Sequence, residues 1–168
     1  MQAVRFILFL LLSLGNVSSE LYHVTPSLND PCPSTSDFCL TLSQFVNSSD
    51  VYISFNTTLI FLFGNHSLDL KLTVDNVNTF SMFSNSVSTS DKVRIICNDH
   101  GMFQFDNISI VHISALTFHG CIRHRVISVN YFVLEDIDFM HTAALELVKT
   151  TARLVKNSFR FNVANKLI

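Results

Sequence analysis

The residues that best fit a catalytic role are the carboxylates of Glu135-Asp136-Ile137-Asp138, the densest acidic group in the sequence. Hydrolysis of a glycosidic bond needs two carboxyl groups about 5 to 9.5 Å apart that face each other across the bond. A lyase needs several acids to hold a calcium ion beside a basic proton acceptor, and Arg123 and Arg125 precede this group. Too few acids accompany these arginines, so we interpret the acidic group as a solvated polar face.

A second group with chemical potential is His119-x-Cys121-x-x-His124, which gathers three residues of metal-ligating type. Its spacing matches no recognised zinc motif, and Cys121 is better used in a disulfide. The sequence contains no G-x-S-x-G turn and no glycine-rich phosphate loop. We therefore predict no catalytic residue, no metal site and no cofactor, and we expect the protein not to be an enzyme.

The composition limits what kind of fold positions these groups. The chain has 168 residues, of which 48% are hydrophobic and 14% are charged, and this suits one domain with an ample core. A net charge of -2 gives no field that attracts phosphate backbones, so nucleic acid is not an expected partner. The content of 16 Phe, no Trp and only 4 Gly, with many Ser, Thr and Asn, favours an all-β chain.

Residues 1–19 have the pattern of a secretory signal peptide. Arg5 precedes the apolar stretch Phe6–Leu14, and small residues end at Ser19, after which cleavage is expected. The apolar stretch is much shorter than the ~20 residues that a membrane-spanning helix needs. No later stretch approaches that length, so we predict a secreted, extracellular protein with no membrane span after removal of residues 1–19.

The cysteines agree with an oxidising compartment. They are Cys32, Cys39, Cys97 and Cys121. An even number in a secreted chain predicts disulfides rather than a metal site. Three pairings are formally open, and the sequential one, Cys32 with Cys39 and Cys97 with Cys121, is favoured.

Four N-x-[ST] glycosylation sequons follow the signal peptide. They begin at Asn47, Asn56, Asn65 and Asn107. Chance matches are common in a chain this rich in Asn, Ser and Thr. Even so, we expect at least one of the four to carry a glycan, which would place its backbone at the surface.

The chain beyond the signal peptide divides near residue 50. Residues 20–50 hold all three prolines and are predicted to form an irregular lead-in followed by a short capping helix within Asp37–Val46. Asp37 fits the cap of that helix. In residues 51–168, short apolar segments alternate with Ser, Asn and Asp clusters, which predicts strands.

Apolar residues recur with a period near 21. The triplet Ile113-x-x-Leu116-x-Phe118 recurs as Leu134-x-x-Ile137-x-Phe139, and again as Leu154-x-x-Asn157-x-Phe159. Such a period predicts stacked coils in which equivalent residues lie over one another, with the three phenylalanines in one file. Asn157 is the misfit: it either lies in an internal hydrogen-bonded ladder or shows that the last register is off by one residue.

The same register makes predictions about other side chains. It stacks Glu135 with Ser114 and Val155, Asp136 with Ala115 and Lys156, and Asp138 with Thr117 and Ser158, so no second acid faces the acidic group. It also places Cys97 and Cys121 roughly one coil apart, where their Cα atoms come within bridging distance.

Two solenoids fit this period. Val77-x-x-Phe80-x-Met82 has the same triplet shape, and the stretch from Val77 to Val87 matches the leucine-rich-repeat signature. True leucines are few in these positions, however, and Arg125–Val133 is typical of a strand rather than of a helix. We therefore predict a right-handed parallel β-helix solenoid with a short N-terminal capping helix, and keep the leucine-rich-repeat solenoid as the alternative.

Basic residues gather near the end of the sequence. Lys149, Arg153, Lys156 and Arg160 lie at spacings of four, three and four residues, so Ala143–Lys156 also fits a helix. The bases are interpreted as a solvated face, with a contact surface for another chain as the second interpretation.

Several segments resemble a known group of proteins. The run Cys39-Leu40-Thr41-Leu42-Ser43-Gln44-Phe45 and the block Thr58-Leu59-Ile60-Phe61-Leu62-Phe63-Gly64-Asn65-His66-Ser67-Leu68 are similar to the start of secreted, pectin-lyase-like right-handed β-helix proteins of sponges and other marine invertebrates. This chain has Phe63 where that group typically has Pro. The resemblance implies an architecture and an extracellular location, and it carries no catalytic residue across. Because further coils usually follow in such proteins, the end at Ile168 suggests a short paralogue or a fragment.

These observations together predict an extracellular, non-catalytic glycoprotein module with a recognition, adhesion or structural role. Its expected partner is an extracellular glycan or protein bound along a flat flank. The alternative is a carbohydrate-active enzyme of the pectin-lyase-like type, because that fold includes many enzymes that cleave polysaccharides.

Overall fold

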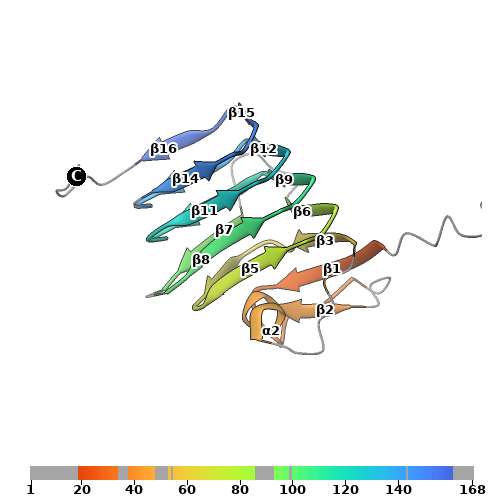
Figure 1. Cartoon of the computed structure of the whole chain (residues 1–168). Helices are drawn as coiled ribbons and strands as arrows, with labels where there is room; N and C mark the ends of the chain where they lie inside the picture. The colour runs from red at the N-terminus through yellow and green to blue at the C-terminus, as the bar shows by residue number, and fades with distance from the viewer. Residues whose placement is uncertain are drawn as a thin grey trace, which may run out of the picture.

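Most of the described chain is β-strand, and the strands form three sheets, each made of parallel strands (Figure 1). The computed structural model describes residues 19–33, 38–47, 53, 55–85, 93–98, 100–142 and 144–160. Sheet A has the strand order β15 (Ala152–Val155), β12 (Tyr131–Glu135), β9 (Ile110–Ser114), β6 (Thr79–Ser84), β3 (Asn56–Phe61), β1 (Ser19–Thr25) and β2 (Cys39–Thr41). Sheet B has the order β16 (Ser158–Arg160), β13 (Asp138–Met140), β10 (Leu116–His119), β7 (Val93–Cys97) and β4 (Asn65–Leu68). Sheet C has the order β14 (Leu145–Val148), β11 (His124–Ile127), β8 (Met102–Asp106) and β5 (Lys71–Asp75).

From β3 onward the chain visits sheets A, B and C in turn. Each strand pairs in parallel with the strand three positions later, so one pass through the three sheets, here called a circuit, lies on the next. The predicted all-β class and the parallel pairing are therefore confirmed. The described residues contain one helix, the six-residue α2 (Leu42–Asn47), although the leucine-rich-repeat alternative expects appreciable helix.

The predicted file of phenylalanines is confirmed. Phe118 is the register partner of Phe139, and Phe139 is the partner of Phe159. Their rings stack nearly parallel, with centroids 5.4 Å apart in the first pair and 5.0 Å apart in the second. Ile113, Leu134 and Leu154 form a second file in sheet A, as predicted.

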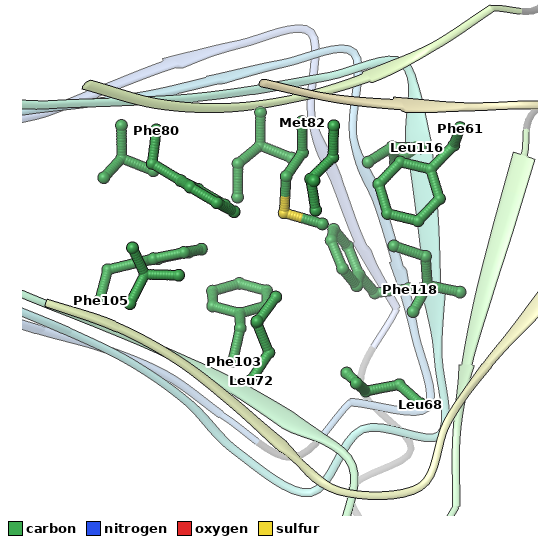
Figure 2. Close-up of a cluster of buried hydrophobic side chains, with 14 of the residues drawn as sticks. Phe61, Leu68, Leu72, Phe80, Met82, Phe103, Phe105, Leu116 and Phe118 are labelled. Carbon is green, nitrogen blue, oxygen red and sulfur yellow. The ribbon is translucent and has the colours of Figure 1, made fainter. Parts of the chain in front are cut away.

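The inward-facing side chains of all three sheets meet in one core (Figure 2). Met82 enters it from sheet A, Phe118 from sheet B and Phe103 from sheet C. All three are buried, because alternate residues of a strand point to the same face and each strand shows this face to the interior. The core becomes more accessible at the last circuit, where Leu154 is 49% exposed and Phe159 37% exposed.

Asn157, the misfit of the repeat, hydrogen-bonds to the backbone of the preceding circuit. Its Nδ2 donates to the carbonyl of Leu134 at 2.9 Å, and its Oδ1 accepts from the amide of Ile137 at 2.9 Å. The second of the two explanations, a register shifted by one residue, is therefore wrong. A polar side chain is accommodated at this position because both the nitrogen and the oxygen of its amide group find backbone partners.

The triplet Val77-x-x-Phe80-x-Met82 has the shape of the others but occupies a different place in its circuit. Met82 is the register partner of Ile113, so Phe80 and Met82 lie within β6 of sheet A. In the true repeat the chain turns from sheet A to sheet B between the first and second positions, and the last position lies in sheet B. The resemblance arose because apolar residues with the same spacing occur at two different corners of a circuit.

Many of the described corners between sheets contain a residue with positive φ. Corners from C to A use Asn76, Asn107, Ser128 and Lys149; those from A to B use Ala115, Asp136 and Lys156; those from B to C use Gly120 and His141. Their φ values lie between 49° and 75°. This left-handed conformation is uncommon outside glycine, and at matching corners it recurs from circuit to circuit. At one corner the amides form a ladder, in which Asn107 donates to Asn76 at 2.6 Å.

The N-terminal end differs from the prediction of an irregular lead-in. Residues 19–25 form β1, which pairs with β3 on one side and β2 on the other. The capping helix is present but begins at Leu42, and its Leu42 and Phe45 are buried. Its cap is Thr41, whose Oγ1 accepts from the amide of Gln44 at 3.2 Å while the Gln44 side chain accepts from the amide of Thr41 at 2.9 Å. The predicted cap, Asp37, and the signal peptide other than Ser19 lie outside the described residues.

The alternative helix over Ala143–Lys156 is wrong. This segment contains β14 and β15, separated by a corner at Lys149. The basic residues with helical spacing are therefore distributed around the last circuit instead of sharing one helix face. Backbone pairing with β11 and β12 outweighs the local helical pattern.

Both predicted disulfides are confirmed. Cys97 and Cys121 lie on neighbouring circuits with Cα atoms 4.8 Å apart, and Cys32 pairs with Cys39 at 6.3 Å. The first bond ties the end of β7 to the segment after β10, so it links two layers of the stack. Among the helical residues that the structure describes, no segment has the length and apolar character needed to cross a membrane.

Candidate functional site

A shallow groove of about 460 Å³ runs along the corner between sheets A and B. It is lined by Ser114, Ala115, Glu135, Asp136 and Lys156. These residues come from three successive circuits, and each circuit contributes at the same corner. The acidic group singled out in the sequence therefore contributes to a concave surface.

The predicted stacking of the acidic group is confirmed. Glu135 is the register partner of Ser114 and of Val155, while Asp138 is the partner of Thr117 and of Ser158. Asp136 occupies the same left-handed corner as Ala115 and Lys156, and its amide donates to the carbonyl of Val155 at 2.9 Å.

Asp138 is not among the residues that line the groove. The hydroxyl of Ser158 donates to its Oδ1 at 2.6 Å. The groove thus contains two carboxylates, which follow one another in the sequence, together with the ammonium group of Lys156. Such a surface offers hydrogen-bond donors and acceptors to a polar ligand.

His112 lies beside Glu135 on the outer face of sheet A. Its Nε2 lies 3.9 Å from Oε2 of Glu135, and its ring packs edge-on against Phe83 at 5.1 Å between centroids. On β12, Tyr131 and Val133 point outward with Glu135, because alternate residues of a strand share a face. Tyr131 is 51% exposed and neighbours Ile110, which is 44% exposed.

The two arginines considered for a lyase lie on a different sheet. Arg125 Nε contacts Oε2 of Glu146 at 3.0 Å, and Arg123 contacts the same oxygen at 2.5 Å. Both arginines are thereby paired at sheet C, near β11 and β14. The structure does not bring them to the groove, whose lining residues lie at the corner of sheets A and B.

The candidate metal group His119, Cys121 and His124 is divided by the fold. Cys121 is in a disulfide, and His124 is fully buried, with its ring stacked on Phe103 at 3.8 Å between centroids. Its Nδ1 accepts from the amide of Phe103 at 3.2 Å. Burial lowers the pKa of His124 to about 3, so its imidazole is neutral. In the described ranges no three His, Cys, Asp or Glu residues cluster as metal ligands would.

The four sequons lie in different environments. Asn47 ends α2, Asn65 begins β4 and Asn107 forms a corner, and all three are exposed. Asn56 is partly buried at the start of β3, where its Oδ1 accepts from Nδ2 of Asn78 at 3.3 Å.

Sequence reasoning missed Tyr131, His112 and a pairing of His119 with His141. The alternating pattern of β12 contains the signal for Tyr131, because it places Tyr131 and Glu135 on one face. The pairing of histidines depends on a corner conformation, which no local pattern reveals. Comparison with known protein families, curated proteins and solved structures finds no match for this chain.

Proposed function

We propose that this protein is an extracellular, non-catalytic recognition module with the architecture of a right-handed parallel β-helix. It binds an extended glycan along the outer face of sheet A. The single observation that carries this proposal is that β12 presents an exposed tyrosine, Tyr131, on the same outer face as Glu135, which lines the polar groove.

The β-helix assignment is supported by the order of the strands. Each circuit returns the chain to the sheet it left, as from Val74 to Phe105 in sheet C and from Phe139 to Phe159 in sheet B. Crossovers between parallel strands of one sheet are right-handed in nearly all proteins, and this favours the right-handed form. The proposal includes membership of the pectin-lyase-like group that the sequence resembles.

The extracellular location is supported by the two disulfides, since such bonds persist in oxidising compartments. We further propose that the secreted chain is glycosylated, and the sequon positions rank the sites. Asn65 is exposed, whereas Asn56 is held against Asn78 and followed by the buried Thr57.

We expect a glycan on Asn65 and none on Asn56. The physical reason is that the Asn56 side chain, to which the glycan would be attached, is partly buried between neighbouring circuits. Mass spectrometry of glycopeptides from the protein secreted by eukaryotic cells checks this. An occupied Asn56 beside an empty Asn65 would contradict the ranking.

The glycan preference rests on the chemistry of the outer face. Aromatic rings present a flat apolar surface with polar edges, which suits the faces of sugar rings. Tyr131 and Glu135 lie four residues apart on one strand, or about 13 Å. Circuits stack about 4.8 Å apart, so the corner residues Ala115, Asp136 and Lys156 follow one another along the groove at regular intervals.

We expect Tyr131→Ala to weaken polysaccharide binding about tenfold, because it removes the aromatic contact. Phe63→Ala is the matched control, since Phe63 is 66% exposed but lies outside sheet A. The measurement is a binding screen against acidic and neutral polysaccharides, followed by titration of the best binder. Equal losses in the two variants would contradict a specific site at Tyr131.

The same screen separates recognition from catalysis. Reducing-end and unsaturated-product assays are run beside the binding titrations. Product release that Glu135→Gln abolishes would overturn the non-catalytic proposal in favour of a carbohydrate-active enzyme. Binding without turnover supports the recognition module.

A further inference from the structure

Two histidines from successive circuits lie side by side at the corner between sheets B and C. His119 ends β10, and His141 follows β13. Their rings are 5.0 Å apart between centroids at an angle of 77°. The two residues are far apart in the sequence, so only the stacking of circuits brings them together.

The backbone holds this pair in place. In the β10–β13 register, His119 is the partner of Met140. The amide of Gly120 donates to the carbonyl of Met140 at 3.0 Å, and the amide of His141 donates to that of Arg160 at 2.9 Å. The neighbouring Cys97–Cys121 disulfide joins the same corner to the preceding circuit. Side chains that are held by a rigid backbone lose little conformational freedom when they bind another group.

His141 shares the left-handed backbone conformation of the other corners, and histidine is among the non-glycine residues that adopt it more readily. Its φ is 54°, whereas the equivalent position of the preceding circuit is Gly120 with φ 75°. Here the conformation places the His141 ring against that of His119.

Both rings are available for a ligand. Within the described part of the chain, neither His119 nor His141 has a side-chain hydrogen bond or an ion pair. His141 is exposed and His119 is partly exposed. In contrast, His66 and His124 are buried, and His112 lies beside Glu135.

We propose that His119 and His141 form a copper-binding site, with the thioether of Met140 as an additional ligand. Metal–imidazole bonds of about 2.0 to 2.1 Å place each ring centre about 3 Å from the metal, so two rings around one tetrahedral ion are about 5 Å apart. The observed separation of 5.0 Å matches this value. Imidazole suits copper in both oxidation states, thioether suits copper(I), and copper(II) is the tightest binder among the divalent first-row ions.

A nearby cation gives the site a testable electrostatic property. Arg160 is the register partner of Met140 on the next strand. Its positive charge opposes binding of a metal ion, so the affinity of the site is expected to increase when the charge is removed.

The experiment titrates the full chain with Cu²⁺, and separately with Cu⁺ in competition with a copper(I) chelator. His141→Asn is the main variant, because asparagine tolerates the left-handed conformation and keeps the corner. We expect His141→Asn and His119→Gln each to weaken Cu²⁺ binding at least tenfold, and Arg160→Gln to strengthen it. Electron paramagnetic resonance of bound Cu²⁺ should show two nitrogen ligands that decrease to one in each histidine variant.

His112→Gln is the matched control, because it removes a surface histidine outside the pair. Circular dichroism checks that all variants retain the wild-type fold. The proposal is overturned if His141→Asn binds Cu²⁺ as tightly as the wild type, or if His112→Gln causes an equal loss. Tighter binding of Zn²⁺ than of Cu²⁺ would overturn the assignment to copper.

Discussion

Replacement of Phe139 with Ala is expected to lower the free energy of unfolding by about 3 to 5 kcal/mol. Phe139 is fully buried in the centre of the phenylalanine file. It stacks between Phe118 and Phe159, and its ring also lies 5.8 Å from that of His124 between centroids. Removal of the ring leaves a cavity that the surrounding strands cannot close, because their backbones are fixed by pairing on both sides.

Phe159→Ala provides the matched comparison. Phe159 belongs to the same file but is 37% exposed at the last circuit, so its replacement opens less of a cavity. We expect a loss of less than half that of Phe139→Ala. Urea denaturation of both variants, with the midpoint and the slope measured separately, checks the ranking. Equal losses, or a greater loss for Phe159→Ala, would show that the file is not packed as the structure indicates.

Acidification from pH 6.5 toward pH 3 is expected to destabilise the protein through His124. The pKa of its imidazole is about 3 in the folded chain, because of burial, and about 6.5 in an unfolded chain. Between these values the unfolded state binds a proton that the folded state does not bind. Stability is therefore lost as the pH falls. The stabilisation that depends on neutral His124 is fully present above pH 6.5, and below that pH the folding equilibrium constant decreases about tenfold per pH unit.

His124→Phe tests this prediction by removing the titrating group. The variant leaves the amide of Phe103 without its acceptor, which costs about 1 to 3 kcal/mol at neutral pH. Its free energy of unfolding should nevertheless depend less on pH than that of the wild type between pH 6.5 and 5. Burial also lowers the pKa of His66, which is present in both proteins, so part of the slope remains. The measurement is urea denaturation at several pH values, and equal slopes for the two proteins would refute the prediction.

The parts of the fold that the sequence predicted correctly depend on stacking of equivalent residues. Phe118, Phe139 and Phe159 recur at a nearly constant spacing because each circuit returns the chain to the same sheet. The register of the acidic group followed from the same period, and so did the pairing of Cys97 with Cys121. The prediction failed at residues 19–25, whose strand is stabilised by pairing with β3, a distant segment of the chain. Pairing with a distant segment cannot be inferred from the local sequence pattern. The three nearby prolines also favoured the prediction of an irregular segment.

The candidate sites were less accessible to sequence reasoning than the core. The carboxylates of the groove were found, because acidic residues that follow one another stand out in a chain with few charges. The connection of Glu135 with Tyr131 and His112 required knowledge of which residues face outward on two neighbouring strands. The pairing of His119 with His141 depends on the left-handed corner at His141. From sequence alone, such a corner is expected at glycine or asparagine rather than at histidine.

The sequence by itself determined the period of the stack and the identity of the inward-facing files, and it favoured one of the three cysteine pairings. The period and the files repeat once per circuit, so they can be recognised from the order of residues along the chain. The tertiary structure decided which outward side chains meet: the groove beside Lys156, the exposed Tyr131 and the two adjacent histidines. The groove and the histidine pair depend on corner residues with positive φ, which redirect the chain and set the direction of the side chain.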